Sequence, residues 1–265
     1  MQYPLLFSPF QLGPNRLKNR VMALPVFSGY AHPGGWVSSL LITHYRKLAA
    51  SGASVVVVAN AAVAEDGVAS THNLRVDADP YIAGLAKLAA AIREEGAVAC
   101  LQLNHAGRFA KTSQPLLPSA LDNENLAFNI SSLKNFMNFF PFEKRFALTR
   151  YFLRMIGTWR RGMEAEDLER IRNHFVEAAE RALKAGFDMI ELHGASGYLL
   201  NQFLSSFTNK LSSPYGGDFQ SRTAFPLSVI REIRERIPAP FPVGFRLNLR
   251  AVSYTHLTLP TNREV

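Results

Sequence analysis

The 265-residue sequence contains a single cysteine, Cys100. One cysteine cannot build a disulfide framework, a Cys-rich zinc site or a cysteine-ligated iron–sulfur cluster within these residues, and we expect no metal site. No window approaches the roughly 18 uninterrupted apolar residues of a transmembrane helix, so no integral membrane association is expected. The N-terminal stretch MQYPLLFSPFQLGPNRLKNR lacks the charged start and apolar run of a secretory signal. A reducing, cytoplasmic setting is therefore expected.

Acidic residues are scarce in one segment, and this explains most of the formal charge of +8. Between Lys134 and Arg161 there are seven basic residues against one acid, Glu143, which is +6 of the total. A patch confined to one segment argues against a nucleic-acid binder, which usually spreads basic residues along a whole face. With 48% hydrophobic and 19% charged residues, the chain has the composition of a soluble globular protein rather than a disordered one.

Apolar, β-branched runs alternate with amphipathic patterns along the chain. The runs predict strands at Arg20–Leu24, Ser54–Ala59, Ala97–Leu103, Phe187–Leu192 and Pro242–Leu247. The amphipathic patterns predict helices at Ser38–Ala50, Asp79–Glu95 (with Asp79 as its cap), Glu164–Lys184 and Thr223–Ile237. Nearly continuous apolar strands that alternate with helices indicate a parallel sheet covered by helices, which is the α/β class.

Two parallel folds compete, an open doubly wound sheet and a closed (β/α)₈ barrel. The absence of a G-x-G-x-x-G motif after the first strand removes the best evidence for a dinucleotide-binding sheet. Polar residues instead follow the carboxyl ends of several strands, where barrel enzymes place their chemistry. These residues are Asn60, Asn104, His105, His193 and Asn248. The sequence therefore predicts a (β/α)₈ TIM barrel.

The predicted barrel is incomplete, because only about five of eight βα units are present. Closure would need roughly 100 further residues at about 30 per unit. We expect residues 1–250 to form a partial barrel with an insertion at about 116–162. The stretch 251–265 offers no helix after the last strand. We expect a truncated product with a non-native tail, and a genuine C-terminus is the alternative.

The strongest motif follows the fourth predicted strand. It reads HGASGYLLNQFL from His193 to Leu204 and continues to Tyr215-Gly216-Gly217 and Arg222. This motif resembles the old yellow enzyme family of FMN-dependent NAD(P)H:flavin oxidoreductases, whose pattern is His-x-Ala-(His or Asn)-Gly-Tyr-Leu-Leu-Asn-Gln-Phe-Leu. The resemblance implies a TIM barrel, FMN as cofactor and NAD(P)H as reductant. It also implies a small-molecule substrate in which an alkene is conjugated to a carbonyl.

Elementary chemistry accounts for the residue types in this motif. Reduction of such an alkene builds negative charge on the carbonyl oxygen, which preorganised hydrogen-bond donors stabilise. The imidazole of His193 can supply one donor, and Tyr198 can deliver the proton as general acid. The resemblance adds Ser196, where the family has His or Asn as a second donor. A serine hydroxyl reaches less far, which implies a different substrate orientation or substrate class.

Further positions match the family's flavin contacts. The stretches LFSPF and KNRVM resemble its N-terminal segment and first strand. By resemblance, Pro25, Val26 and Phe27 lie against the flavin, although the family commonly has Thr or Cys where this chain has Phe27, which affects redox tuning. Asn60 falls where the family lines the flavin edge, and a strand-end turn residue is the alternative.

Two polar residues inside apolar strands need buried partners. Gln102 carries both a donor and an acceptor, which suits the flavin pyrimidine edge that the resemblance assigns to it. Arg246 is always charged and requires an anion or strong acceptors. The resemblance places it near the flavin N1/O2 edge, and an ion pair with a neighbouring strand is the alternative. Cys100 is expected to be a small buried hydrophobe, and His105 and Arg108 either shape the pocket mouth or pair locally.

Several functional alternatives remain open from the sequence. The loops after strands 7–8, which hold the FMN phosphate in the family, lie outside this sequence, so weakened flavin binding is expected. The basic, amphipathic stretch Phe142–Arg160 predicts a lid or a subunit contact, and the chain is a possible homo-oligomer. Rival readings are the dienoyl-CoA reductase or amine dehydrogenase branch of the family, an incompetent fragment that retains no flavin, and a basic interaction module.

Overall fold

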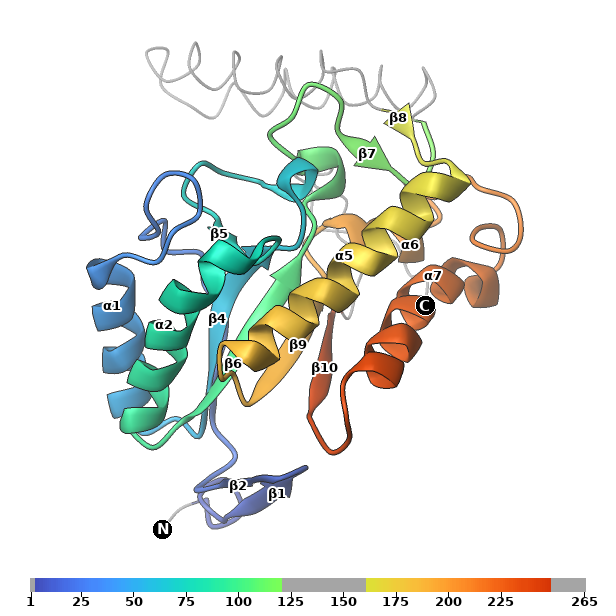
Figure 1. Cartoon of the computed structure of the whole chain (residues 1–265). Helices are drawn as coiled ribbons and strands as arrows, with labels where there is room; N and C mark the ends of the chain where they lie inside the picture. The colour runs from blue at the N-terminus through green and yellow to red at the C-terminus, as the bar shows by residue number, and fades with distance from the viewer. Residues whose placement is uncertain (1–2, 121–160, 249–265) are drawn as a thin grey trace, which may run out of the picture.

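A curved parallel sheet forms the centre of the computed structural model, which describes residues 3–120 and 161–248 (Figure 1). The strand order is β10-β9-β6-β4-β3, and the short β5 pairs with the end of β4. Their bounds are β3 Met22–Ala23, β4 Val55–Ala62, β5 Leu74–Arg75, β6 Val98–Asn104, β9 Met189–Gly194 and β10 Val243–Leu247. The five strands of the main path correspond to the five predicted runs. The α/β class and the incomplete (β/α)₈ architecture are confirmed.

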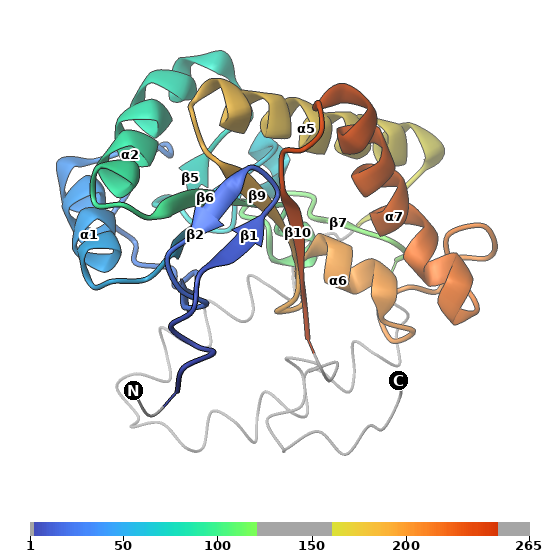
Figure 2. The same ribbon diagram turned by 90° about the horizontal axis from the view of Figure 1, so that it is seen from below.

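Four helices form an arc on the outer face of this sheet (Figure 2). They are α1 Ser39–Ala50, α2 Ile82–Glu94, α5 Ala165–Lys184 and α7 Phe219–Arg236. Local sequence fixes where they begin: the Ser38 side chain accepts a hydrogen bond from the amide of Leu41. Glu164 and Asp167 form a reciprocal capping box at the start of α5. Each helix buries one apolar stripe against the sheet, as the periodicity predicts.

The boundaries differ from the predictions in two places. Asp79 does not cap α2, because it lies in the 3₁₀ turn Asp79–Tyr81 and its carboxylate accepts a hydrogen bond from Arg181 Nε at 2.8 Å. The helix predicted from Thr223 begins four residues earlier, at Phe219, because Asp218 caps it by accepting from the amide of Ser221. The predicted helix Phe142–Arg160 and the stretch 251–265 lie outside the described residues.

Short elements that the sequence did not predict complete the described fold. Two are small sheets, made by β1 Phe10–Leu12 with β2 Asn15–Leu17 and by β7 Leu116–Leu117 with β8 Arg161–Gly162. A six-residue helix, α6 Leu199–Leu204, follows β9, and 3₁₀ turns lie at Glu65–Gly67 and Gly107–Phe109. No helix within 3–120 and 161–248 is long and apolar enough to cross a membrane.

Side-chain alternation divides the core into two parts. On β4, Val56 and Val58 face the helices and belong to the large core, whereas Val55 and Val57 face inward. The inward cluster also contains Cys100, Met189 and Leu17, the last of which comes from β2. Cys100 is completely buried among apolar neighbours, which confirms that it is a small hydrophobe, and burial raises the pKa of its thiol.

The β1–β2 hairpin lies across the amino ends of the strands (Figure 2). The Asn15 side chain donates a hydrogen bond to the carbonyl of Asp188 at 3.2 Å, just before β9. Gly13 has φ +56°, and a Cβ there would stand 2.7 Å from the Pro240 carbonyl, so only glycine fits the tip of the hairpin. The hairpin therefore covers the amino end of the sheet, whereas the candidate site residues lie near the carboxyl end.

Candidate active site

Alternation along three adjacent strands places the predicted polar residues on the inner face of the sheet. Cys100 and Met189 face the inner cluster, so residues two positions further along their strands share that face. Gln102 of β6 lies opposite Glu191 of β9, and His193 of β9 lies opposite Arg246 of β10. The sequence-predicted Gln102, His193 and Arg246 are thus brought together near the carboxyl edge.

Glu191 joins two of these residues. Its Oε1 accepts hydrogen bonds from Gln102 Nε2 and from Arg246 Nε, both at 2.7 Å, and its Oε2 accepts from Arg246 Nη2 at 3.0 Å. The Arg246–Glu191 contact is bidentate and spans neighbouring strands, which was the alternative considered for Arg246. We call Gln102, Glu191 and Arg246 the polar clamp. Glu191 was missed from the sequence, although a carboxylate flanked by Ile190 and Leu192 in an apolar run was a usable signal.

His193 and Tyr198 lie in contact above the polar clamp. Their ring centroids are 4.9 Å apart, with an edge-to-face angle of 71°. Burial lowers the pKa of His193 to about 4, and the positive charge of Arg246 adds to this effect. The imidazole is therefore neutral at neutral pH. Its Nδ1 is buried and has no hydrogen-bond partner among the described residues.

A tight turn carries the chain from β9 to Tyr198. Ser196 has φ +59°, which is uncommon for a residue with a side chain and is concentrated at functional sites. Hydrogen bonds hold the turn: Gly197 N donates to Asn201 Oδ1 at 3.0 Å, and Gln202 Nε2 donates to the Gly197 carbonyl at 2.7 Å. Tyr198 directly precedes α6, so the turn fixes the backbone position from which the Tyr198 side chain extends.

The remaining flavin-contact candidates occupy different surroundings. Pro25, Val26 and Phe27 follow β3 without regular secondary structure, and Val26 and Phe27 are 70% and 50% exposed. Asn60 lies inside β4 rather than after it, at the register shift between Val58 and Ala61. A bulge there lets the strand continue past the predicted end. The buried Asn60 Oδ1 accepts a hydrogen bond from Asn73 Nδ2 at 2.9 Å.

His105 belongs to an ionic cluster beside the site. Its Nε2 lies 3.3 Å from Asp66 Oδ1, and its Nδ1 accepts from the amide of Gly107 at 3.1 Å. Arg170 of α5 bonds to the other oxygen of Asp66 at 2.9 Å. Burial opposes the ionisation of Asp66, but the hydrogen bonds from His105 and Arg170 outweigh it and hold its pKa below the usual range. His105 therefore pairs with Asp66, which is the local pairing that was one of its two predicted roles.

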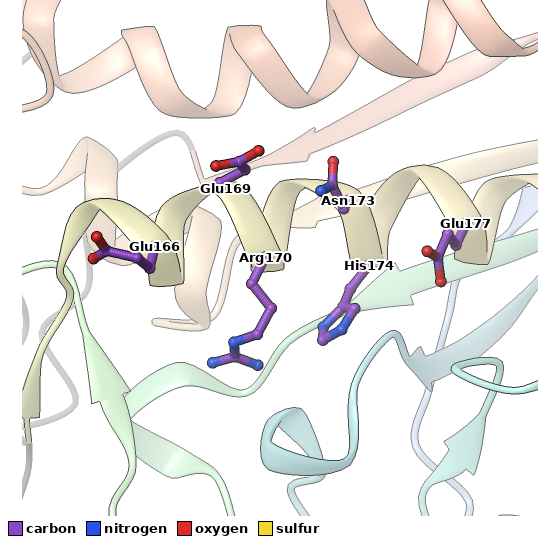
Figure 3. Close-up of a pocket in the computed structure, with 6 residues that line it drawn as sticks. All are labelled: Glu166, Glu169, Arg170, Asn173, His174 and Glu177. Atoms are coloured by element: carbon purple, nitrogen blue, oxygen red, sulfur yellow. The ribbon is translucent and has the colours of Figure 1, made fainter.

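A hollow of about 360 Å³ lies on α5 alone and takes no part in this site (Figure 3). It is lined by Glu166, Glu169, Arg170, Asn173, His174 and Glu177. Arg170 is already engaged by Asp66 and Asp167, so the hollow offers no free cation there. Within 3–120 and 161–248 no group of three or more His, Cys, Asp or Glu side chains could hold a metal ion.

The low pKa of His193 predicts a loss of stability in mild acid. An unfolded histidine titrates near 6.5, so between pH 7 and pH 5 the unfolded chain takes up a proton at this position that the folded chain does not. Stability from this group is complete above about pH 6.5 and is lost as the pH falls towards 4, by about 2 kcal/mol between pH 7 and pH 5. Urea unfolding at the two pH values measures this loss.

The matched variants are His193→Asn and His174→Asn. His193→Asn is expected to abolish most of the difference between pH 7 and pH 5. His174 also has a pKa lowered by burial and by Arg170, but its shift is smaller, and its replacement should remove less of the difference. Equal acid sensitivity in the wild-type chain and His193→Asn would contradict the prediction.

Comparison with known proteins identifies the class to which this fold and site belong. Residues 5–260 match the NADH:flavin oxidoreductase / NADH oxidase family, and the chain belongs to this family. An NADH oxidase from Thermoanaerobacter brockii is 33% identical over 93% of this chain and 34% of its own length. An NADPH dehydrogenase from Bacillus cytotoxicus is 32% identical over 87% of this chain and 58% of its own length.

Solved structures give the same result. An old yellow enzyme from Pichia sp. AKU4542 superposes with a TM-score of 0.75 and 25% identity over 91% of this chain and 58% of its own. Morphinone reductase superposes with a TM-score of 0.72 and 28% identity over 91% of this chain and 61% of its own. The resemblance to the old yellow enzyme family is confirmed. The chain spans about one third to three fifths of the length of the relatives named here.

FMN is the cofactor of this family and NAD(P)H is its reductant. Two features of the described residues fit a flavin with a polar substrate beside it at the carboxyl edge. His193 Nδ1 and both polar atoms of the Asn104 side chain are buried there without partners in the described chain. The exposed apolar segment Pro25–Phe27 follows the edge strand β3. The apolar segment suits one face of a planar heterocycle, and the unpartnered polar atoms suit the polar group of a second ligand beside it.

Proposed function

We propose that this chain carries the flavin- and substrate-binding part of an FMN-dependent oxidoreductase that reduces an alkene conjugated to a carbonyl. The observation that carries the proposal is the contact between a neutral imidazole, His193, and Tyr198 at the carboxyl edge. This reaction needs a neutral hydrogen-bond donor at the carbonyl oxygen and a general acid, such as a phenol, at the α-carbon.

Each residue of the site has a distinct role in the proposal. His193 holds the substrate's carbonyl oxygen, with Ser196 at the rim of the same turn, and Tyr198 delivers a proton to the α-carbon. FMN, when bound, would supply the hydride, with NAD(P)H as the reductant. Because burial and Arg246 keep His193 unprotonated, it acts as a hydrogen-bond donor and leaves the proton transfer to Tyr198.

The polar clamp would hold the flavin ring from the inner face. Glu191 fixes Gln102 and Arg246 in one orientation, so their remaining donor and acceptor atoms are positioned before a ligand arrives. Pro25, Val26, Phe27 and Asn60 complete the proposed flavin contacts. The buried free thiol of Cys100 agrees with a reducing, cytoplasmic setting, which is part of the proposal.

Titration of FMN into the purified chain tests the proposal. Binding is expected to quench flavin fluorescence, and Gln102→Leu should weaken FMN binding about tenfold, the equivalent of one lost hydrogen bond to a buried partner. Asn173→Leu changes an exposed amide on α5 and serves as the control, with unchanged affinity expected. The proposal fails if FMN does not bind, or if Gln102→Leu binds FMN as tightly as the wild-type chain.

A second candidate is the dienoyl-CoA reductase or amine dehydrogenase branch of the family, in which the relatives matched are longer than this chain. The NADH oxidase from Thermoanaerobacter brockii is matched over 93% of this chain but only 34% of its own length. A histamine dehydrogenase from Rhizobium sp. 4-9 is likewise matched over 96% of this chain and 33% of its own, with a TM-score of 0.74 and 25% identity. Turnover of an amine rather than an enone would favour this branch.

A further inference from the structure

Asn104 is the last residue of β6, and its side chain satisfies none of its hydrogen-bonding capacity. The residue is 1% exposed, and both Oδ1 and Nδ2 are buried with no partner among the described residues. Gln102, two positions earlier on the same face, is bound by Glu191 at 2.7 Å. Because nearly all buried amides are paired in folded proteins, two orphaned atoms on one side chain point to a ligand.

A second orphaned group lies on the adjacent strand. The parallel register pairs Gln102 with Glu191 and Leu103 with Leu192, and its continuation brings Asn104 beside His193. The Nδ1 atom of His193 also has no partner in the described chain. Three unpartnered polar atoms thus lie on the adjacent strands β6 and β9 at the carboxyl edge of the inner face.

Neither group carries charge. Asn104 is an amide, and the low pKa of His193 leaves its imidazole neutral. The guanidinium of Arg246 is engaged by its bidentate contact with Glu191, so its donors on that side are already used. Such a pair suits the oxygen of a ketone, aldehyde or ester, whereas a carboxylate would lose its hydration without meeting a positive charge.

We propose that Asn104 and His193 together bind the substrate's carbonyl oxygen and select neutral carbonyl compounds over free carboxylates. This inference rests on the function proposed above and adds a residue and a substrate class to it. Asn104 supplies the second donor that the short side chain of Ser196 does not provide. The position costs folding stability because its amide is unpaired until substrate binds.

The experiment follows the side-chain amide resonance of Asn104 in the ¹⁵N-labelled chain with FMN present. The resonance is assigned by its loss in Asn104→Leu and, independently, in Asn104→Ser. Cyclohex-2-enone is expected to shift it, and acrylate is expected to bind at least tenfold more weakly. Asn104→Leu should weaken enone binding about tenfold, whereas the control Asn173→Leu should leave it unchanged.

A stability measurement accompanies the titration. Asn104→Leu removes an unpaired amide of similar shape, so its melting temperature is expected to equal or exceed that of the wild-type chain. A fall in melting temperature would indicate a purely structural role and overturn the inference. So would enone binding that leaves the Asn104 resonance unmoved, acrylate binding as tight as enone binding, or an absence of enone binding.

The outcome is separable from that of the proposed function. Flavin fluorescence in the same samples reports FMN binding, and the Asn104 resonance reports the carbonyl site. If FMN binds and the enone does not shift Asn104, only the present inference fails. If the enone shifts Asn104 while FMN does not bind, the flavin proposal fails and the carbonyl site stands.

Discussion

Replacing Glu191 with leucine is expected to lower the free energy of unfolding by about 3 to 4 kcal/mol. The substitution removes both contacts of a bidentate pair and strands the guanidinium of Arg246, whose side chain is 24% exposed, on the inner face. It also removes the only hydrogen-bond acceptor that the described structure gives to Gln102 Nε2. A charge and an amide left without partners account for the size of the effect. Urea denaturation at pH 7 measures it.

Two further variants separate the ion pair from general damage. Glu94→Leu breaks an exposed ion pair, in which the side chains of Arg46 and Glu94 are 47% and 63% exposed. It should lower the free energy of unfolding by less than about 1 kcal/mol. The double variant Glu191→Leu/Arg246→Met replaces the pair with apolar groups and should regain much of the loss, because no charge remains without a partner. If Glu191→Leu unfolds at the same urea concentration as Glu94→Leu, the clamp does not stabilise the sheet.

The second large effect is expected at Phe225. Its ring is completely buried in α7 and stacks on Phe203 of α6, with centroids 4.3 Å apart and an angle of 25°. Phe225→Ala should cost about 3 to 5 kcal/mol, since it leaves a cavity that two packed helices cannot close. Because α6 starts at the residue after Tyr198, the loss should also loosen the position of Tyr198.

Leu227 provides the matched control for this substitution. It lies two residues further along α7 and is 43% exposed, so Leu227→Ala should change stability by less than about 1 kcal/mol. Thermal unfolding gives the stability change. Equal losses from Phe225→Ala and Leu227→Ala would contradict the packing argument.

The sheet could be predicted from sequence because its signals are local. Val55–Ala62 and Val98–Asn104 are nearly continuous apolar runs, which is typical of a strand buried on both faces. Caps such as Ser38 and Glu164, together with apolar stripes, likewise predict the helices of the outer face. Short elements such as α6 and the β1–β2 hairpin carry too few residues for a periodic signal.

The organisation of the site depended on information that no local pattern contains. Gln102 and Arg246 were recognised as polar residues that need partners, but their common partner follows from the register of β6, β9 and β10. Glu191 lies 89 residues from Gln102 and 55 from Arg246 along the chain. The orphaned atoms of Asn104 are visible only when every neighbour of a buried side chain is in place.

The hairpin at the amino end has a consequence for synthesis on the ribosome. Its tip packs against Pro240 and Pro242, and Asn15 reaches the residue before β9, so the first strands made are among the last to be fixed. Until β9 emerges, the apolar cluster of Leu17 lacks Met189, and the amino ends of the strands stay open to water. Productive folding of this region must therefore wait for nearly all of the described chain to be translated, which lengthens the period of dependence on chaperones.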